Sequence, residues 1–155
     1  MIVDVKKYKA FCVKALENCG VKPEAAEAVQ IFREAGVSTV MITGDHVDTA
    51  CAMGRQLGIV DRIDQCMTGE ELEQIEAAQL SRRLEQVRVF ARVSPAQKVQ
   101  IVKGFQEKGN IVAMTGDGVN DAPSLKASDI GIAMGMTGTD VAKQASDMIL
   151  TDDNF

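Results

Sequence analysis

The stretch STVMITGD at residues 38–45 is an apolar, β-branched run that ends in a glycine turn, and IVAMTGDG at residues 111–118 has the same pattern. Runs of this kind are typical of buried strands. Amphipathic segments of helical period lie between them, and strands that alternate with helices favour a parallel sheet covered by helices. The sequence therefore predicts an α/β fold, a three-layer sandwich with a mainly parallel sheet.

The rest of the chain is consistent with this architecture. Pro23 and Gly36 mark the ends of one helix, and Pro95 and Gly109 mark the ends of another. By the same criteria we expect helices at 23–35, 47–57, 70–85, 95–108, around Leu125 and at 139–146, and further strands at 87–91, 130–134 and 148–150.

Length and composition favour a single soluble globular domain over residues 1–155, with 46% hydrophobic and 25% charged residues. The net charge of −5, without a block of basic residues, argues against nucleic acid as a partner. No apolar run approaches the roughly 18 residues that a spanning helix needs. The four cysteines form no C-x-x-C pair, so we expect reduced, structural thiols.

Polar residues gather where the two quoted strands end. Ligands bind beyond the carboxyl ends of the strands in an open parallel sheet, so the two loops should meet at one edge. The second loop continues through Asn120 and places the carboxylates of Asp117 and Asp121 four residues apart. Mg²⁺ prefers one or two carboxylates, several waters and a phosphate oxygen. We therefore predict that Asp117 and Asp121 bind Mg²⁺.

The same edge has groups suited to a phosphoryl group. Lys98 lies one turn inside a helix that follows a strand, where its ammonium can neutralise phosphate charge. Thr43 offers a hydroxyl, and Gly44 and Gly116 let the backbone come close to phosphate oxygens.

Each of these residues also has a purely structural interpretation. Asp117 and Asp121 can cap a helix, and a single lysine such as Lys98 is usually a solvated charge. Thr43 and Asp45 can form a turn and an N-cap, which uses the same backbone amides that would bind phosphate.

Three strings resemble, in this order, the signatures of P-type cation-transporting ATPases, members of the haloacid dehalogenase superfamily: TGD at 43–45, RVSPAQK at 92–98 and GDGVNDAP at 116–123. The tail at 138–155 is similar to that of calcium-type pumps. The resemblance covers about residues 23–155. It implies a Rossmann-like, haloacid dehalogenase-like fold and the phosphorylation domain of an ATP-driven cation pump.

The resemblance also implies roles for individual residues. Asp117 would be the principal Mg²⁺ ligand, and Asp121 and Asn120 would orient the metal site. Lys98 would bind the phosphoryl group and Thr43 would hydrogen-bond it.

Four residues would surround the bound nucleotide, phosphate or metal: Gly44, Asp45, Gly116 and Asn120. Asp45 would also face other domains of the pump. The implied partners are ATP or a phosphoryl group and the nucleotide-binding, actuator and membrane domains, with this domain at the cytoplasmic face of the membrane.

The sequence also departs from the family pattern. The Asp-Lys-Thr-Gly-Thr string that carries the family's phosphorylated aspartate does not occur in the 155 residues, nor does the large nucleotide-binding insertion. Without that string the central strand of the sheet lacks its usual sequence. Residues 1–20 are therefore an atypical segment, in which we expect 1–5 (MIVDV) to be a substitute strand and 8–18 a helix.

Three functions are compatible with these observations. The first is the phosphoryl-transfer domain of a cation pump, with an isolated chain that is inactive because it lacks the nucleophile motif. The second is a non-catalytic, engineered or truncated scaffold of the same fold. The third is a small-molecule phosphatase that uses Asp4, although no second carboxylate lies beside Asp4 in the sequence.

Overall fold

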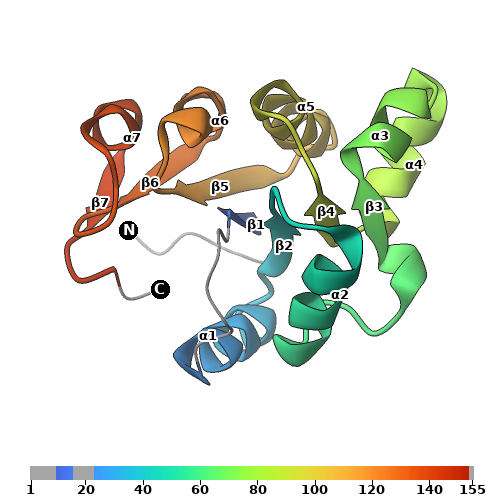
Figure 1. Cartoon of the computed structure of the whole chain (residues 1–155), viewed down its shortest axis with the longest axis horizontal. Coiled ribbons are helices and arrows are strands. Elements are labelled where there is room, and N and C mark those ends of the chain that lie inside the picture. Colours follow the sequence, from blue (N-terminus) through green and yellow to red (C-terminus); the bar gives the residue numbers. More distant parts are fainter. Residues whose placement is uncertain (1–9, 16–22, 154–155) are drawn as a thin grey trace.

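The computed structural model describes residues 10–15 and 23–153, which form a sheet of seven strands in the order β3-β4-β2-β1-β5-β6-β7 (Figure 1). Every neighbouring pair is parallel. The strands are β1 Ala10–Ala15, β2 Ser38–Ile42, β3 Cys66–Thr68, β4 Val89–Ala91, β5 Ile111–Gly116, β6 Ile130–Met134 and β7 Met148–Leu150. The predicted parallel α/β fold is therefore confirmed.

The central strand is β1, which pairs with β2 on one side and β5 on the other. The expected helix at 8–18 is thus wrong, since Ala10–Ala15 within it is a strand. The expected strand at 1–5 lies outside the described residues. The error has a physical reason: β2 and β5 each need a hydrogen-bonding neighbour, and filling that gap outweighs the local helical pattern.

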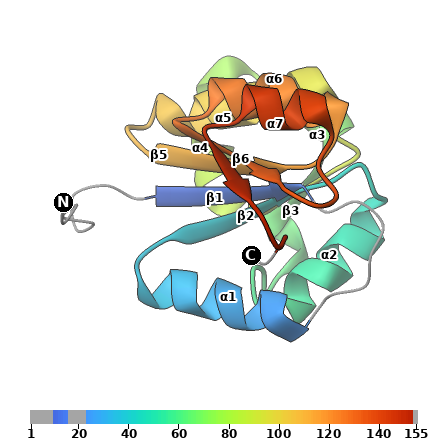
Figure 2. The same ribbon diagram turned by 90° about the vertical axis from the view of Figure 1, so that its left-hand side faces the viewer.

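Helices cover both faces of the sheet, which gives the predicted three layers (Figure 2). The helices α1 Pro23–Glu34 and α2 Val47–Gln56 lie on one face. The other face carries α3 Gly69–Gln74, α4 Ala77–Gln86, α5 Pro95–Gln106, α6 Ala122–Ala127 and α7 Asp140–Ala145.

The alternation of side chains along β2 supplies both halves of the core. Val40 and Ile42 pack into the larger cluster with residues of α4 and α5, whereas Met41 packs into a second cluster with residues of α2. All three side chains are fully buried. A strand buried on both faces explains why three successive residues, 40–42, are apolar rather than alternating with polar ones.

One predicted helix is in fact two. The segment expected at 70–85 is interrupted at Ile75, whose backbone is extended, and α4 begins after Glu76. Ile75 is partly buried against the larger core cluster. The short strand β3 was not predicted, because three residues are too few to show a period.

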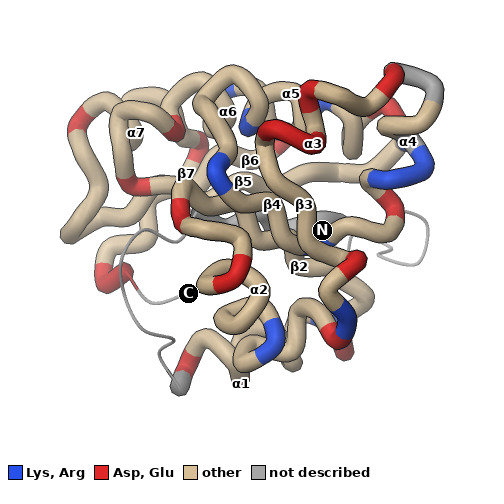
Figure 3. The backbone as a smooth tube through the Cα atoms, turned by 45° about the vertical axis from the view of Figure 1, so that its right-hand side comes forward, with Lys and Arg blue, Asp and Glu red and all other residues tan. Residues whose placement is uncertain are grey.

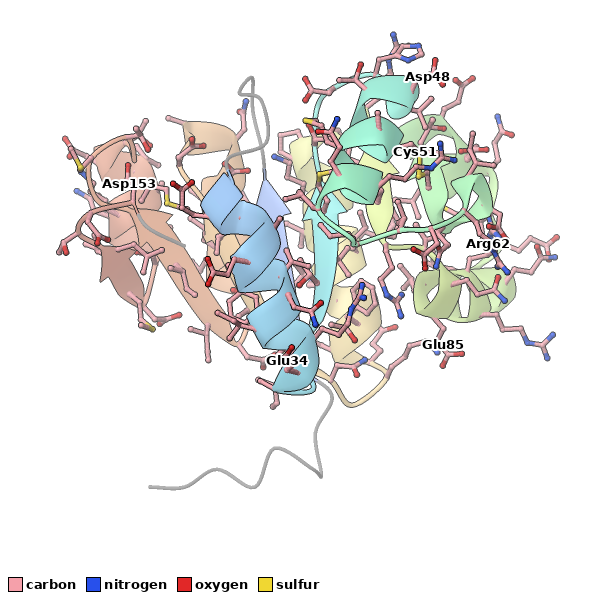
Figure 4. The ribbon with its side chains drawn as sticks, turned by 90° about the horizontal axis from the view of Figure 1, so that it is seen from below. Glu34, Asp48, Cys51, Arg62, Glu85 and Asp153 are labelled. Carbon is pink, nitrogen blue, oxygen red and sulfur yellow. A yellow bond between two sulfur atoms is a disulfide. The ribbon has the colours of Figure 1, made fainter. Side chains whose placement is uncertain are left out.

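The expectation of reduced thiols is wrong for two of the four cysteines. Cys51 in α2 and Cys66 at the start of β3 form a disulfide with a Cα–Cα distance of 6.2 Å (Figure 4). Both residues are buried in the second core cluster. The packing of α2 beside β3 brings the two cysteines together, and a spacing of 15 residues does not reveal this contact in the sequence.

Within 10–15 and 23–153, no helix is long and apolar enough to cross a membrane. Lys and Arg are spread over several elements rather than gathered in one block (Figure 3).

Candidate functional site

Two loops of similar sequence lie at the carboxyl edge of the sheet. The strands β2 and β5 both run parallel to β1, on opposite sides of it, with Ala15 beside Ile42 and Lys14 beside Thr115. The loop after β2 starts at Thr43, and the loop after β5 starts at Asp117. The predicted meeting of the two loops at one edge is therefore what the topology produces.

A buried ion pair anchors the second loop. The Lys98 Nζ atom lies 2.6 Å from the Asp121 Oδ1 atom, and the two side chains are only 4% and 1% exposed. Lys98 stands in the first turn of α5, where its amide donates to the Ser94 carbonyl oxygen. Charges buried this deeply are costly to desolvate, so the loss of either partner would leave an uncompensated buried charge.

The second oxygen of Asp121 holds the backbone of the loop. Asp121 Oδ2 accepts hydrogen bonds from the Asp117 amide at 3.3 Å and from the Gly118 amide at 3.1 Å. Gly116 makes this close approach possible, because a Cβ atom at that position would lie 2.5 Å from the Asp121 Cβ atom. Both carboxylate oxygens of Asp121 are thus engaged in positioning Lys98 and the loop.

Asp117 occupies a different environment from Asp121. Its side chain is half-buried at the start of the loop. Its backbone oxygen accepts a hydrogen bond of 2.8 Å from the Thr139 amide, which ties the loop to the residue that caps α7. Asn120, in the same loop, is exposed. Asp117 is therefore the carboxylate of this loop that solvent can reach while its backbone is held from both sides.

The first loop is stabilised by its own side chains. The Thr43 hydroxyl donates to Asp45 Oδ2 at 3.0 Å and accepts from the Asp45 amide at 3.1 Å. Thr43 is buried, and Gly44 is exposed. The turn predicted as the structural alternative for Thr43 and Asp45 is thus present in the structure.

A third loop, between β4 and α5, is hydrogen-bonded to the first loop. The Arg92 amide donates to the Asp45 carbonyl oxygen at 3.1 Å, and the Val93 amide donates to the Thr43 carbonyl oxygen at 3.3 Å. Arg92 has a φ of 51°, in the left-handed region that is unusual for a residue other than glycine. This loop leads directly to the cap of α5, so the first loop is connected through the backbone to the helix that carries Lys98.

The oxygen ligands at this edge suit Mg²⁺ better than they suit a metal ion whose ligands all come from the protein. Among the residues that the structure describes, no three or more His, Cys, Asp or Glu side chains cluster as metal ligands. Mg²⁺ needs only one or two carboxylates, because waters and phosphate oxygens complete its shell. Asp117 can supply one such oxygen ligand.

Two features of the site were not predicted from the sequence. One is the pairing of Lys98 with Asp121, which were assigned to a phosphoryl group and a metal. The other is the contact between Thr139 and Asp117, made by a residue whose sequence pattern indicates only the start of a helix. The spacing of the motifs offers no signal for either contact, since they depend on how α5 packs beside β5 and α7 beside β6.

The model of the haloacid dehalogenase-like hydrolase family matches residues 2–129. The chain belongs to the haloacid dehalogenase-like hydrolase family. Within the superfamily, its sequence is 56% identical over 134 residues to calcium-transporting ATPase 1 of Bacillus cereus, which covers 86% of this chain. It is 57% identical over 129 residues to the human calcium-transporting ATPase type 2C member 2, over 83% of this chain.

These similarities confirm the predicted resemblance to the phosphorylation domain of P-type ATPases. A cation-transporting ATPase of Synechocystis, pma1, is 55% identical over 135 residues. The chain spans only about 15% of the length of the relatives that it matches.

Proposed function

We propose that this chain is the phosphoryl-handling segment of an ATP-driven cation pump, of the calcium-transporting type, and that it binds Mg²⁺ and a phosphoryl group at the carboxyl edge of its sheet. The observation that carries the proposal is the buried Lys98–Asp121 pair next to the half-exposed Asp117. A fold alone needs no buried lysine in the first turn of a helix, and desolvating the pair has a cost. The similarity to calcium-transporting ATPases supports the same conclusion.

Asp117 would bind Mg²⁺, which, when bound, offsets the negative charge of a phosphoryl group. Asp121 would act mainly through its contacts, because its two oxygens accept bonds from Lys98 and from the amides of Asp117 and Gly118. Asp121 therefore positions both the cation on Lys98 and the ligand Asp117. Asn120 would help to orient the same loop from its exposed position.

Lys98 would stabilise the phosphoryl group electrostatically. An ammonium has three N–H donors, of which one is directed to Asp121, and a phosphoryl oxygen would accept another. Because the site around Lys98 is shielded from water, this charge interaction is stronger than at an exposed lysine.

The first loop would contribute the remaining contacts to phosphate. The hydroxyl of Thr43 would exchange its bond to Asp45 for one to a phosphoryl oxygen. Gly44 is exposed and would let the backbone approach a phosphoryl oxygen, whereas Gly116 is buried and would act by leaving room for Asp121. Asp45 would then be released toward the nucleotide or toward another domain of the pump.

The 155 residues contain no Asp-Lys-Thr-Gly-Thr string, and the described part of the central strand, Ala10–Ala15 (AFCVKA), contains no carboxylate. We therefore propose that this chain by itself neither forms an aspartyl phosphate nor hydrolyses ATP. Incubation with acetyl phosphate and Mg²⁺, acid quenching and intact mass measurement should show an unmodified chain. A hydroxylamine-sensitive phosphate that disappears in Asp4→Asn would contradict this and favour the phosphatase alternative.

The Mg²⁺ site is testable by titration followed in amide NMR spectra. We expect the amides of residues 116–121 to shift first, with weak affinity, because the shell lacks a phosphate oxygen. Asp117→Asn should remove most of the response.

Asp61→Asn is a suitable control for this titration, since it makes the same change of charge at an exposed residue outside both loops. A response that survives in Asp117→Asn, or one confined to residues 70–85, would rule out the assignment.

A further inference from the structure

A polar cavity lies at the opposite edge of the sheet from the candidate site. It has a volume of about 210 Å³ and is bounded by the end of α1, the start of β2 and the residue that precedes β4. Because β2 runs from Ser38 to Ile42, the cavity is at its amino end and the phosphoryl site is at its carboxyl end. The two sites share no residue.

Two arginines line this cavity. Arg33 lies in the last turn of α1, and Arg88 is the residue before β4. No Asp or Glu is among the described residues that line it. The arrangement places two positive charges around one small space.

Both guanidinium groups bond to backbone oxygens. Arg33 donates to the Gly58 carbonyl oxygen, and Arg88 Nη1 donates to the carbonyl oxygens of Val87 at 2.9 Å and Leu84 at 3.3 Å. Desolvation lowers the pKa of Arg88, and the nearby charge of Glu85 opposes this effect. Glu85 also pairs with Lys108, so its charge is shared. An anion in the cavity would offset the desolvation of Arg88 through its opposite charge.

One of the residues that line the cavity has a buried hydroxyl without a hydrogen-bond partner. Thr39 is 9% exposed, and its Oγ1 atom makes no hydrogen bond within the part of the chain that the structure describes. A buried donor left unsatisfied costs about 1–3 kcal/mol, so such groups usually have a function or a bound partner. Thr39 and Ser38 both line the cavity.

We propose that this cavity binds a small oxyanion, a phosphate or carboxylate group, between Arg33 and Arg88 with the Thr39 hydroxyl as a further donor. Guanidinium groups match oxyanions with paired, charge-assisted hydrogen bonds. The volume is below the roughly 300–1,000 Å³ of pockets for drug-sized ligands, which suits a single small group. In a longer protein, the carboxylate can come from a side chain of another segment, whereas phosphate is a free ligand.

The test is a titration of the 155-residue chain with inorganic phosphate, acetate and chloride at matched ionic strength, monitored by amide NMR. Phosphate without Mg²⁺ should shift the amides of residues 36–39 in a saturable way. Saturable shifts with acetate also would identify a carboxylate as an alternative source, and shifts with phosphate alone would restrict the site to phosphate. The proposal would be overturned if chloride caused equal, non-saturating shifts, or if phosphate caused no shift at residues 36–39. An ordered water would then be the partner of Thr39.

Variants separate anion binding from a structural role. Arg33→Gln and Arg88→Gln should each weaken phosphate binding by roughly tenfold, the effect of one charged hydrogen bond. Arg55→Gln, an exposed arginine on α2, is the matched control and should leave binding unchanged.

Thr39→Val gives a second readout that does not depend on the arginines. It keeps the side-chain volume and removes the unsatisfied hydroxyl, so the folded chain should be as stable as the wild type or more stable. Phosphate binding should nevertheless weaken several-fold if the hydroxyl donates to the anion. Unchanged affinity in Thr39→Val and in both arginine variants would overturn the proposal even if phosphate shifts are seen.

Discussion

The strands β2 and β5 flank the central strand and both lead to the string Thr-Gly-Asp, which follows β2 but begins within β5, yet the two regions are built differently. After β2, Gly44 is exposed and the Thr43 hydroxyl bonds to Asp45 within the turn. At the end of β5, Gly116 is buried, and the amides of the loop that follows bond to Asp121.

The difference arises from the residues on the carboxyl side of the shared string. Asp121 lies four residues beyond Asp117 and is paired with Lys98 of another helix, whereas the first loop continues directly into α2. The side chains of Thr43 and Asp45 in the first loop thus bond to each other, whereas the side chain of Asp121 in the second loop forms a tertiary ion pair. We therefore expect the two similar strings to differ in their sensitivity to substitution.

The largest loss of stability is expected from a substitution in β1, the strand that pairs with both β2 and β5. Val13 is paired with Val40 of β2 and Met114 of β5, so Val13→Pro removes a ladder hydrogen bond from the central strand. We expect destabilisation of more than about 4 kcal/mol, at the upper end for a single substitution. Urea unfolding monitored by circular dichroism measures this.

Ala10→Pro is the control for that substitution, because a proline at the first residue of a strand is tolerated. If Val13→Pro and Ala10→Pro had the same small effect, β1 would not be what holds the two halves of the sheet together.

The next effect concerns the second loop alone. Lys98→Met leaves Asp121 as an uncompensated buried charge, which typically costs about 3–5 kcal/mol. Lys103→Met on the same helix removes an exposed lysine and should change stability by less than about 0.5 kcal/mol. Comparable losses in the two variants, measured by chemical denaturation, would show that the pair does not stabilise the loop.

The two glycines provide a direct comparison of the loops. In Gly116→Ala the new Cβ would approach the Asp121 Cβ atom to 2.5 Å, and such overpacking costs about 1–3 kcal/mol. In Gly44→Ala nothing lies within 4 Å of the new Cβ, so the change should be within about 1 kcal/mol and favourable through the unfolded state. Thermal unfolding measures the stability of both variants. A larger loss of stability in Gly44→Ala than in Gly116→Ala would contradict this expectation.

The smallest effect tests whether a carboxylate that accepts hydrogen bonds from backbone amides must be fully buried to stabilise the folded chain. Asp153 accepts from the Met136 amide at 2.9 Å and the Thr137 amide at 2.8 Å, as Asp121 does from amides in the second loop, but it is only partly buried (Figure 4). These bonds lower the pKa of Asp153 to about 2 from its ordinary value of 3.8.

Because the folded pKa is depressed, the contribution of Asp153 to stability is present above about pH 4 and is lost as the pH falls through 2. The stability difference between wild type and Asp153→Asn should therefore be small at neutral pH and vanish at the acid end. A difference that grows on acidification, in thermal unfolding at several pH values, would contradict this assignment.

Much of the fold could be predicted because it depends on local pattern. The helix bounded by Pro23 and Gly36 was located within two residues, and the run at 38–42 was identified as a buried strand. Periodicity and capping residues act over one or two turns, so they are visible in the sequence. The expected meeting of the two Thr-Gly-Asp loops is a consequence of parallel pairing, which is itself a rule of local connectivity.

The failures share a different physical origin. Residues 10–15 were predicted as part of a helix, and only the unpaired edges of β2 and β5 explain why they form a strand. Cys51 and Cys66 become neighbours because α2 packs beside β3. In each case the deciding interaction joins segments that are distant in the chain.

By itself, the sequence determined the alternation of strands and helices, the positions of the glycine turns and the family to which the chain belongs, because these depend on residues close together in the chain. Only the tertiary structure decided which segment is the central strand, that Lys98 is paired with Asp121, and that two arginines surround a small cavity at the amino end of β2. Hydrogen bonds between strands and charges buried by packing depend on three-dimensional proximity, which the order of residues does not specify.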